Sequence, residues 1–273
     1  MTNQTKNSML LMLCALIWGT AFVAQSAGSG MGAFSFLAGR SWMAVLVLIP
    51  TVKAFDALHH RQGRPDGKPK SSAERKQLLK AGLVCGTLLF LASAAQQLGI
   101  TLDPSTAKAG FLTAMYVVLV PVFGLFLGRK GSAQLWVSMA IAVVGLYLLC
   151  SPQMDGVRLS LVEFFVVSVE STVAAFLFEQ PAMAEFVTYA GPILYCGVMS
   201  SGVAYTLQIL GQRDLNPAVA SLIMCLESVF SALGGWLLLH QNLSFRESTG
   251  CVLLFAAVVL AQLPLGRLMR SKA

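Results

Sequence analysis

The chain has 273 residues, of which 56% are hydrophobic and only 11% are charged, and its net charge is +7. A soluble domain averages about 25% charged residues, so this composition excludes a water-soluble globular protein. We therefore expect membrane-spanning helices, each formed by about 20 largely apolar residues. Nine stretches fit this description: 9–27, 33–52, 81–101, 109–128, 135–150, 159–178, 190–210, 218–239 and 249–265.

The first stretch, 9–27, is predicted to be a retained span. A single lysine, Lys6, precedes it, and the apolar run is too long for the core of a signal peptide. It also lacks a convincing A-x-A site followed by a soluble domain, which a cleaved signal peptide would show.

The segment between the second and third spans, 53–80, is strongly basic. It holds eight lysines and arginines against three acidic residues, which accounts for +5 of the net charge. Basic loops stay on the cytoplasmic side of a membrane and attract anionic lipid, so this loop is placed inside. Binding of nucleic acid by the loop is the alternative that we do not expect. The Pro, Gly and Ser residues of its central stretch, 59–74, predict a disordered linker.

The cysteines and histidines do not form a predicted metal or disulfide site. The six cysteines all lie within or at the end of apolar stretches, and none forms a C-x-x-C pair. They are typical of small helix-packing residues. His59 and His60 lie in the basic loop without other ligands beside them. We therefore expect neither a metal nor another cofactor.

A short polar hinge, 151–158, separates the fifth and sixth stretches. With the basic loop inside, the first half obeys the positive-inside rule. The second half does not, because Arg213 and the basic tail at 267–272 would lie outside.

An internal repeat accounts for this reversal. A shift of 111 residues places 83–127 on 194–238 without a gap and gives ten identities in 45 positions, including Gln97 on Gln208 and Asp103 on Asp214. Stretches three to five then correspond to stretches seven to nine. Inverted-repeat transporters require an odd offset between corresponding helices, whereas the offset here is four. We therefore predict that one helix is missing at the hinge.

Five segments, taken in order, resemble the EamA-type drug/metabolite transporters: LIWGTAFVAQ (16–25), AFSFLAGRSWMAVLVL (33–48), STAKAGFLTAMYVVLVPVFG (105–124), SSGVAYTLQILGQRDLNP (200–217) and LESVFSALGGWLLLHQNLS (226–244). The resemblance covers nearly the whole chain. It implies two inverted repeats of five helices and the transport of small metabolites, often amino acids and related compounds, by exchange or proton coupling.

The chain departs from the family pattern in three places. The helix that resembles the family's sixth is absent. Ser228 stands where the family has a proline, and His240-Gln241 stands where it has Gly-Glu.

Charged residues inside a span are costly, so each is a functional candidate. Arg40, in the second span, is placed to hold a substrate carboxylate in a bidentate pair, or else snorkels as a structural arginine. Glu227, in the eighth span, falls on Tyr116 in the repeat. Desolvation favours the neutral form of a buried carboxyl, so Glu227 is either a site for a coupling proton or a hydrogen-bonded packing residue.

Glu163 and Glu170 share one face of their helix. They line a pore, or they are substitutions in a helix that has lost its packing neighbour, which is the explanation we favour. Pro121 is predicted to kink the fourth span. Neutral candidates for the translocation path or for interhelical hydrogen bonds are Trp18, Gln25, Gln96, Gln97, Tyr116, Tyr205 and Gln208.

These observations predict an all-α, polytopic helical membrane protein with two related multi-helix repeats of five and four spans, at 1–150 and 151–273. We expect a multi-pass transporter of the bacterial cytoplasmic membrane that moves small metabolites by alternating access. Its expected partners are a small-molecule substrate and membrane lipid, and the class is compatible with a homo-oligomer. The principal alternative is a truncated, transport-inactive family member. A membrane enzyme is less favoured because no nucleophile or metal motif is present. A channel is less favoured because two packed repeats with buried polar pairs suit alternating access better.

Overall fold

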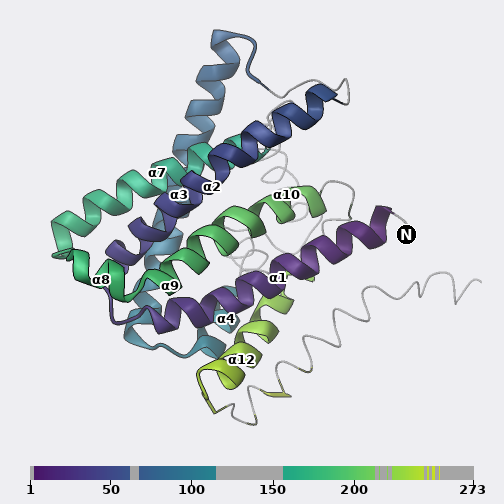
Figure 1. Cartoon of the computed structure of the whole chain (residues 1–273). Coiled ribbons are helices and arrows are strands. Elements are labelled where there is room, and N and C mark those ends of the chain that lie inside the picture. Colours follow the sequence, from purple (N-terminus) through teal and green to yellow (C-terminus); the bar gives the residue numbers. More distant parts are fainter. Residues whose placement is uncertain are drawn as a thin grey trace, which may run out of the picture.

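The computed structural model describes residues 3–61, 68–114, 156–212 and 223–242, together with 215, 220, 245, 248–249 and 252. Within these residues the chain is helical (Figure 1). The elements are α1 (Asn3–Ala27), α2 (Ala33–Arg61), α3 (Ser72–Leu102), α4 (Thr106–Ala114), α7 (Gly156–Phe178), α8 (Met183–Thr188), α9 (Ala190–Leu194), the π-helix η1 (Tyr195–Ala204), α10 (Tyr205–Gln212) and α12 (Leu226–Leu238).

Five of the described helices are long and apolar enough to cross a membrane: α1, α2, α3, α7 and the continuous run 190–212. They correspond to the predicted spans 9–27, 33–52, 81–101, 159–178 and 190–210. The prediction of an all-α polytopic membrane protein is therefore confirmed. The predicted spans 109–128, 135–150, 218–239 and 249–265 lie wholly or partly outside the described residues, so the division into five and four spans stays a prediction.

The predicted loop 53–80 is shorter than expected, because both flanking helices extend into it. α2 continues to Arg61, and α3 begins at Ser72. Ser71 caps α3 by accepting a hydrogen bond from the Glu74 amide at 3.1 Å, and the Glu74 carboxylate reaches back to the Lys70 amide at 2.7 Å. Such reciprocal caps satisfy the free amides of a helix start. The helices take up 53–61 and 72–80, where lysine, arginine and glutamate are good helix formers. Most of the stretch predicted as a linker, 59–74, lies between them, and its residues 62–67 fall outside the described ranges.

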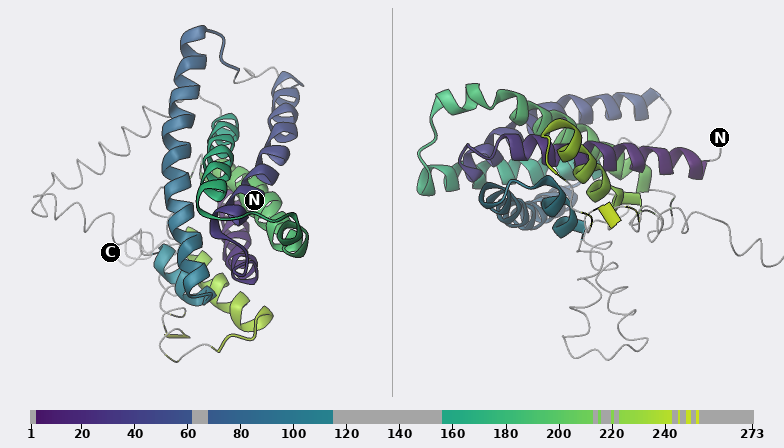
Figure 2. Two further views of the ribbon diagram at one scale, coloured as in Figure 1. Left: turned by 90° about the vertical axis from the view of Figure 1, so that its left-hand side faces the viewer. Right: turned by 90° about the horizontal axis from the view of Figure 1, so that it is seen from below.

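The helices pack in two groups. α7 lies between α2 and α3, and α1 packs against α10, η1 and α12, with α4 in contact with both α12 and α1 (Figures 1 and 2). η1 contacts both α1 and α2 and so joins the two groups. This arrangement surrounds a space between the groups with helices from both ends of the chain.

Small residues allow the close helix contacts. Gly82 and Gly86 of α3 face α7, where an added Cβ would lie 2.3 Å from Val162 Cγ1 and 2.7 Å from Val166 Cβ, respectively. Small residues four apart are the usual means of close packing between membrane helices. Only glycine fits at these two positions.

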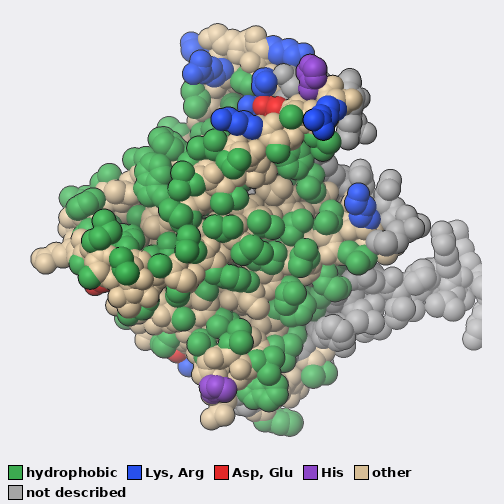
Figure 3. Space-filling view, viewed as in Figure 1, with side chains coloured by type: hydrophobic (Ala, Val, Ile, Leu, Met, Phe, Trp, Pro, Cys, Tyr) green, Lys and Arg blue, Asp and Glu red, His purple; other side chains and the backbone are tan. Residues whose placement is uncertain are grey.

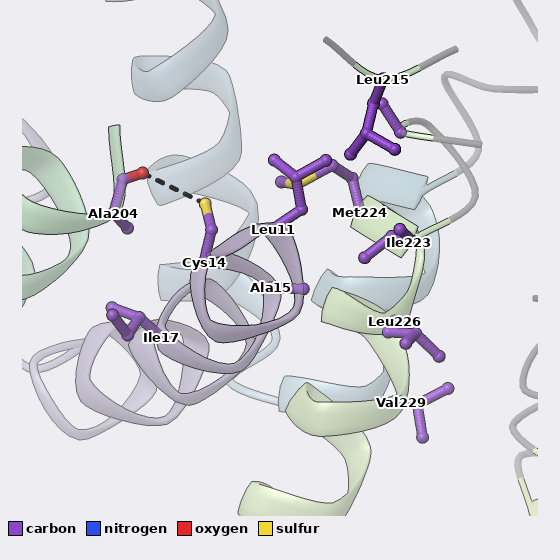
Figure 4. Packing of buried hydrophobic residues seen from close by; sticks show 11 residues of the cluster. Leu11, Cys14, Ala15, Ile17, Ala204, Leu215, Ile223, Met224, Leu226 and Val229 are labelled. Carbon is purple, nitrogen blue, oxygen red and sulfur yellow. Dashed lines mark hydrogen bonds between the residues drawn. The ribbon is translucent and has the colours of Figure 1, made fainter. Parts of the chain in front are cut away.

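The α1–α12 contact is a buried apolar cluster (Figure 4). Leu11 and Ala15 of α1 pack with Leu226 and Val229 of the α12 segment, and the Cys14 thiol donates a hydrogen bond to the carbonyl of Ala204, 3.2 Å away. This buried apolar cluster holds α1 against helices that lie about 200 positions later in the sequence.

The outer surface suits a membrane. Hydrophobic side chains cover the middle of the face in Figure 3, whereas Lys and Arg side chains gather at one end, over the ends of α2 and α3. Large side chains such as Leu88 of α3 and Phe176 of α7 are exposed. An apolar surface of this extent is stable only in contact with lipid or a partner.

Candidate functional site

A cavity of about 410 Å³ lies between the two groups of helices. Residues of α1, α2, α3, α4, α7, η1, α10 and α12 all contribute to its wall. Its volume falls within the usual range for small-molecule pockets. Of the nine residues named above as candidates for substrate binding or the translocation path, namely Arg40, Glu227 and the seven neutral ones, seven line it: Trp18, Gln25, Arg40, Gln96, Tyr205, Gln208 and Glu227.

Aromatic rings form one side of the cavity. Trp18 of α1 packs edge-on against Tyr205 with ring centroids 5.1 Å apart, and Tyr205 packs edge-on against Phe164 of α7 at 4.9 Å. The Trp18 indole Nε1 donates a hydrogen bond to the carbonyl of Ser200, 3.0 Å away. The three rings therefore tie α1, α7 and α10 together beside the cavity, and the Trp18 hydrogen bond adds η1.

The π-helix η1 places backbone groups at the cavity. Ser200 and Ser201 lie in η1 and line the cavity wall. π-Helices are rare, and they occur frequently at functional sites. The Thr20 hydroxyl of α1 pairs with the Tyr195 hydroxyl, at the start of η1, at 2.6 Å. α1 thus holds η1 at its start through Tyr195 and at its end through the Ala204 carbonyl, which accepts from Cys14.

Arg40 is almost fully buried, with 7% of its surface exposed, and its side chain lies beside the Cys196 thiol and the Tyr205 ring. Glu227 on α12 is 8% exposed. Arg40, Glu163 and Glu227 all lie close enough to Tyr205 to act on it electrostatically. The cavity wall therefore carries a guanidinium and a carboxyl group in a low-dielectric environment, where interactions with a charged solute are strong.

Neutral polar side chains complete the wall. Gln25 of α1 is 3% exposed, and its Oε1 has no hydrogen-bond partner among the described residues. Gln96 of α3 donates to the Thr113 hydroxyl of α4 at 3.0 Å, and both residues line the cavity. An unsatisfied buried oxygen at a cavity is suited to accept a hydrogen bond from a solute or a water molecule.

Gln97 does not lie where the repeat predicted. Its side chain is completely buried, away from the cavity wall, and its amide has no hydrogen-bond partner among the described residues. Its repeat equivalent, Gln208, does line the cavity. The prediction for Tyr116 and the predicted kink at Pro121 fall on residues outside the described ranges.

Glu163 and Glu170 are both half-buried. Glu170 faces α3, where its Oε1 accepts a hydrogen bond from the Thr87 hydroxyl at 2.7 Å. Neither carboxyl belongs to the described cavity wall. Glu170 therefore serves the α3–α7 contact, whereas Glu163 lies near Tyr205 behind the wall.

Sequence reasoning missed Ser200, Ser201, Ser93 and Gln212, which also line the cavity. Ser200 and Ser201 lie in a π-helix, whose wider turn does not follow the spacing of an α-helix. The spacing of the serine pair in the sequence therefore gave no signal for their position in the wall. The described residues contain no group of three His, Cys, Asp or Glu side chains that could bind a metal ion.

Two segments, 6–151 and 150–263, each match the EamA-like transporter family, and together they cover most of the chain. The chain belongs to the EamA-like transporter family. It is also 25% identical over 284 aligned positions to an uncharacterized transporter from Archaeoglobus fulgidus, an alignment that covers 93% of this chain and 84% of that protein. No solved structure matches the chain.

The family assignment gives the cavity its context. α1, α2, α3 and α4 belong to the first matched segment, and α7, η1, α10 and α12 belong to the second. The cavity therefore lies where the two EamA-like segments meet. The resemblance to EamA-type transporters expected from the sequence is confirmed, and the chain is a multi-pass membrane protein of the drug/metabolite transporter type.

Proposed function

We propose that this EamA-like protein is a secondary transporter that moves a small organic solute across the cytoplasmic membrane by alternating access, with the cavity between the two matched segments as its substrate site. The observation that carries the proposal is the position of Arg40 and Glu227 in one cavity wall at the junction of these segments. Transporter sites are expected near the middle of the membrane at such a junction.

The charges of the cavity favour an amino-acid-like solute. The Arg40 guanidinium suits a carboxylate, to which it can donate two parallel hydrogen bonds. Glu227 suits an ammonium group or a coupling proton, and the Trp18 and Tyr205 rings offer π-faces to a cation. A zwitterion would satisfy both charges at once, which lowers the cost of removing each of them from water.

The experiment is counterflow in proteoliposomes, with a panel of zwitterionic, anionic and cationic solutes. Arg40→Lys keeps the charge and loses the bidentate geometry, whereas Arg40→Gln loses both. We expect transport of carboxylate-bearing solutes to fall at least tenfold in both variants, because a lost charge-assisted hydrogen bond costs about 1.5–3 kcal/mol. Loss that does not depend on the solute's carboxylate would contradict the assignment of Arg40.

The coupling role of Glu227 needs a separate measurement. Glu227→Gln keeps the size and removes the titrating group, so we expect transport driven by a proton gradient to stop while exchange of solute continues. If the gradient drives the Glu227→Gln variant as well as the wild type, the coupling proton binds elsewhere.

The unequal lengths of the two matched segments favour the alternative, an inactive truncated family member. The first matched segment covers 146 residues and the second 114, and the difference of 32 corresponds to about one helix and its turn. A C-terminal fusion to alkaline phosphatase or to a fluorescent protein tests the span count. An active phosphatase places the tail outside and supports an odd number of spans. Absence of counterflow for every solute in folded protein would support the inactive alternative.

A further inference from the structure

Residues of α2 and α7 that lie 123 positions apart in the sequence make equivalent contacts with neighbouring helices. α2 begins at Ala33 and α7 at Gly156, which are 123 residues apart. Glycines 111 residues apart in their neighbours, Gly86 of α3 and Gly197 of η1, pack against them. A Cβ on Gly86 would lie 3.0 Å from the Glu163 carbonyl oxygen, and a Cβ on Gly197 would lie 2.6 Å from the Arg40 carbonyl oxygen.

Arg40 and Glu163 are themselves 123 residues apart, so α3 meets α7 at the position at which η1 meets α2. α2 and α7 also contact each other directly. There, Trp42 and Phe165, again 123 residues apart, pack edge-to-face with ring centroids 5.8 Å apart and an interplanar angle of 89°. A residue that contacts its own equivalent lies at an axis of twofold symmetry. The Trp42–Phe165 pair therefore marks the centre of the α2–α7 contact.

Glu179, directly after α7, forms a link between α7 and α2 at one end of their contact. Its Oε1 accepts a hydrogen bond from the Phe34 amide at 2.9 Å. Its Oε2 accepts from the Ser35 amide at 2.8 Å and from the Ser35 hydroxyl at 2.6 Å. A carboxylate at a helix start satisfies free amides and complements the helix dipole. Glu179 thereby ties the end of α7 to the start of α2.

At the other end of the α2–α7 contact, Asp56 of α2 forms an ion pair with Arg158 in the first turn of α7. The shift of 123 carries Asp56 onto Glu179 and Ser35 onto Arg158. The two links thus join equivalent positions at opposite ends of α2 and α7, through different chemical groups. Asp56 and Arg158 are both largely buried, at 15% and 17% side-chain exposure, so water screens this pair less than it would a surface pair.

We propose that these two links are the gates of the transporter: the Glu179–Ser35 link closes one side of the membrane and the Asp56–Arg158 link closes the other. This assignment rests on the proposed transport function. If α2 and α7 rock about the Trp42–Phe165 contact, then opening one end separates the link at that end and leaves the other intact. In the structure both links are formed.

The gates differ in chemistry, which makes them separable. Glu179 is held by three donors of the α2 start, two of them backbone amides, which only a substitution to proline would remove. Asp56 is held by the Arg158 side chain, and Lys68 lies 3.7 Å from its carboxylate. We therefore expect that substitution of Arg158, the partner of Asp56, breaks the Asp56 link. The Glu179 link should break when its own carboxylate is replaced.

The test measures which side of the membrane reaches the cavity. A reporter, Ser200→Cys, is placed in the cavity wall of a variant in which the six native cysteines are replaced. A membrane-impermeant thiol reagent is then applied to right-side-out and to inside-out vesicles. We expect Asp56→Asn to raise labelling from the side of the basic loop relative to the other side, and Glu179→Gln to shift the ratio the opposite way. Each shift should be about tenfold, as for one lost charge-assisted hydrogen bond.

Two further variants make the result specific. The exchange Asp56→Arg with Arg158→Asp should restore the wild-type ratio, because it rebuilds the ion pair in reverse. Asp103→Asn breaks an exposed link to Lys108 at the α3–α4 turn and should leave the ratio unchanged. Shifts in the same direction for Asp56→Asn and Glu179→Gln, or a lower unfolding temperature with an unchanged ratio, would overturn the gate assignment.

Labelling needs no substrate, so the two proposals can fail separately. Opposite shifts in a chain that transports no solute would reject the proposed transport function and support the two gating links. An unmoved ratio in a chain that does transport would reject the gates alone.

Discussion

Gly19 is the point at which α1 comes closest to α12, and its replacement tests whether this close approach holds the cavity together. A Cβ at Gly19 would lie 2.4 Å from Phe230 Cβ, 2.7 Å from the Glu227 carbonyl oxygen and 2.9 Å from the Ser231 amide nitrogen. Ordinary contacts begin at about 3.4 Å. Gly19→Ala must therefore move α12 away from α1 by about 1 Å, and Glu227 moves with it.

The size of the effect follows from two opposing contributions. Alanine gains about 1 kcal/mol over glycine in helix propensity, whereas overpacking costs about 1–3 kcal/mol. The cost lies at the upper end here, because two of the three obstacles are backbone atoms. The net loss is therefore about 1–2 kcal/mol. At about 2–4 °C per kcal/mol for a chain of this size, the unfolding temperature should fall by about 2–8 °C.

Gly99 of α3 is the matched control, because a Cβ there would meet nothing within 4 Å. Gly99→Ala keeps the propensity gain without the clash, so its unfolding temperature should be unchanged or higher. Both variants are measured by tryptophan fluorescence during heating in detergent at one scan rate. The same change in unfolding temperature for both variants would refute the close approach of α1 and α12.

Three further predictions concern single polar contacts. Trp18→Phe keeps an aromatic side chain, a smaller one, and removes the donor to the Ser200 carbonyl, so KM for transport should rise about two- to tenfold; an unchanged KM would exclude a positioning role. Ser231→Ala removes a buried hydroxyl that donates to a backbone carbonyl of α4. This loss of about 1 kcal/mol should lower the unfolding temperature by about 2–4 °C, and no change would mean that the bond contributes nothing. A hydrogen bond from Lys108, with one from a neighbouring backbone amide, lowers the pKa of the Asp103 carboxyl. Its stabilisation is complete above the ordinary aspartate pKa of about 3.9 and is lost as the pH falls through the lowered value. The small stability difference between wild type and Asp103→Asn, seen in thermal scans at several pH values, should therefore disappear in acid; a difference that persisted there would contradict this cause.

The sequence predicted much of the site because charge and polarity are costly inside a membrane. Arg40 and Glu227 stood out for this reason, and both line the cavity. The glutamines show where this reasoning ends. Gln96 and Gln97 are adjacent, and one residue turns a helix face by about 100°, so composition does not decide which of the two faces the cavity. Packing selects Gln96.

The serine pair shows a second limit. Ser200 and Ser201 face the cavity from a π-helix, whose wider turn changes the direction of each side chain relative to an α-helix. Hydrophobic periodicity assumes a regular helix and therefore does not predict this direction. The Trp18 indole, which binds the Ser200 carbonyl, comes from a helix 182 residues away in sequence.

By itself, the sequence determined the membrane class, the positions of the long described helices and both charged residues of the described cavity wall, Arg40 and Glu227, because each depends on the local density of apolar and polar side chains. The tertiary structure decided which helices touch. The Glu179 carboxylate at the start of α2 and the Asp56–Arg158 pair at its far end join residues more than 100 positions apart. Such contacts depend on how two helix surfaces fit together in space, and a pattern read along a single helix does not carry that information.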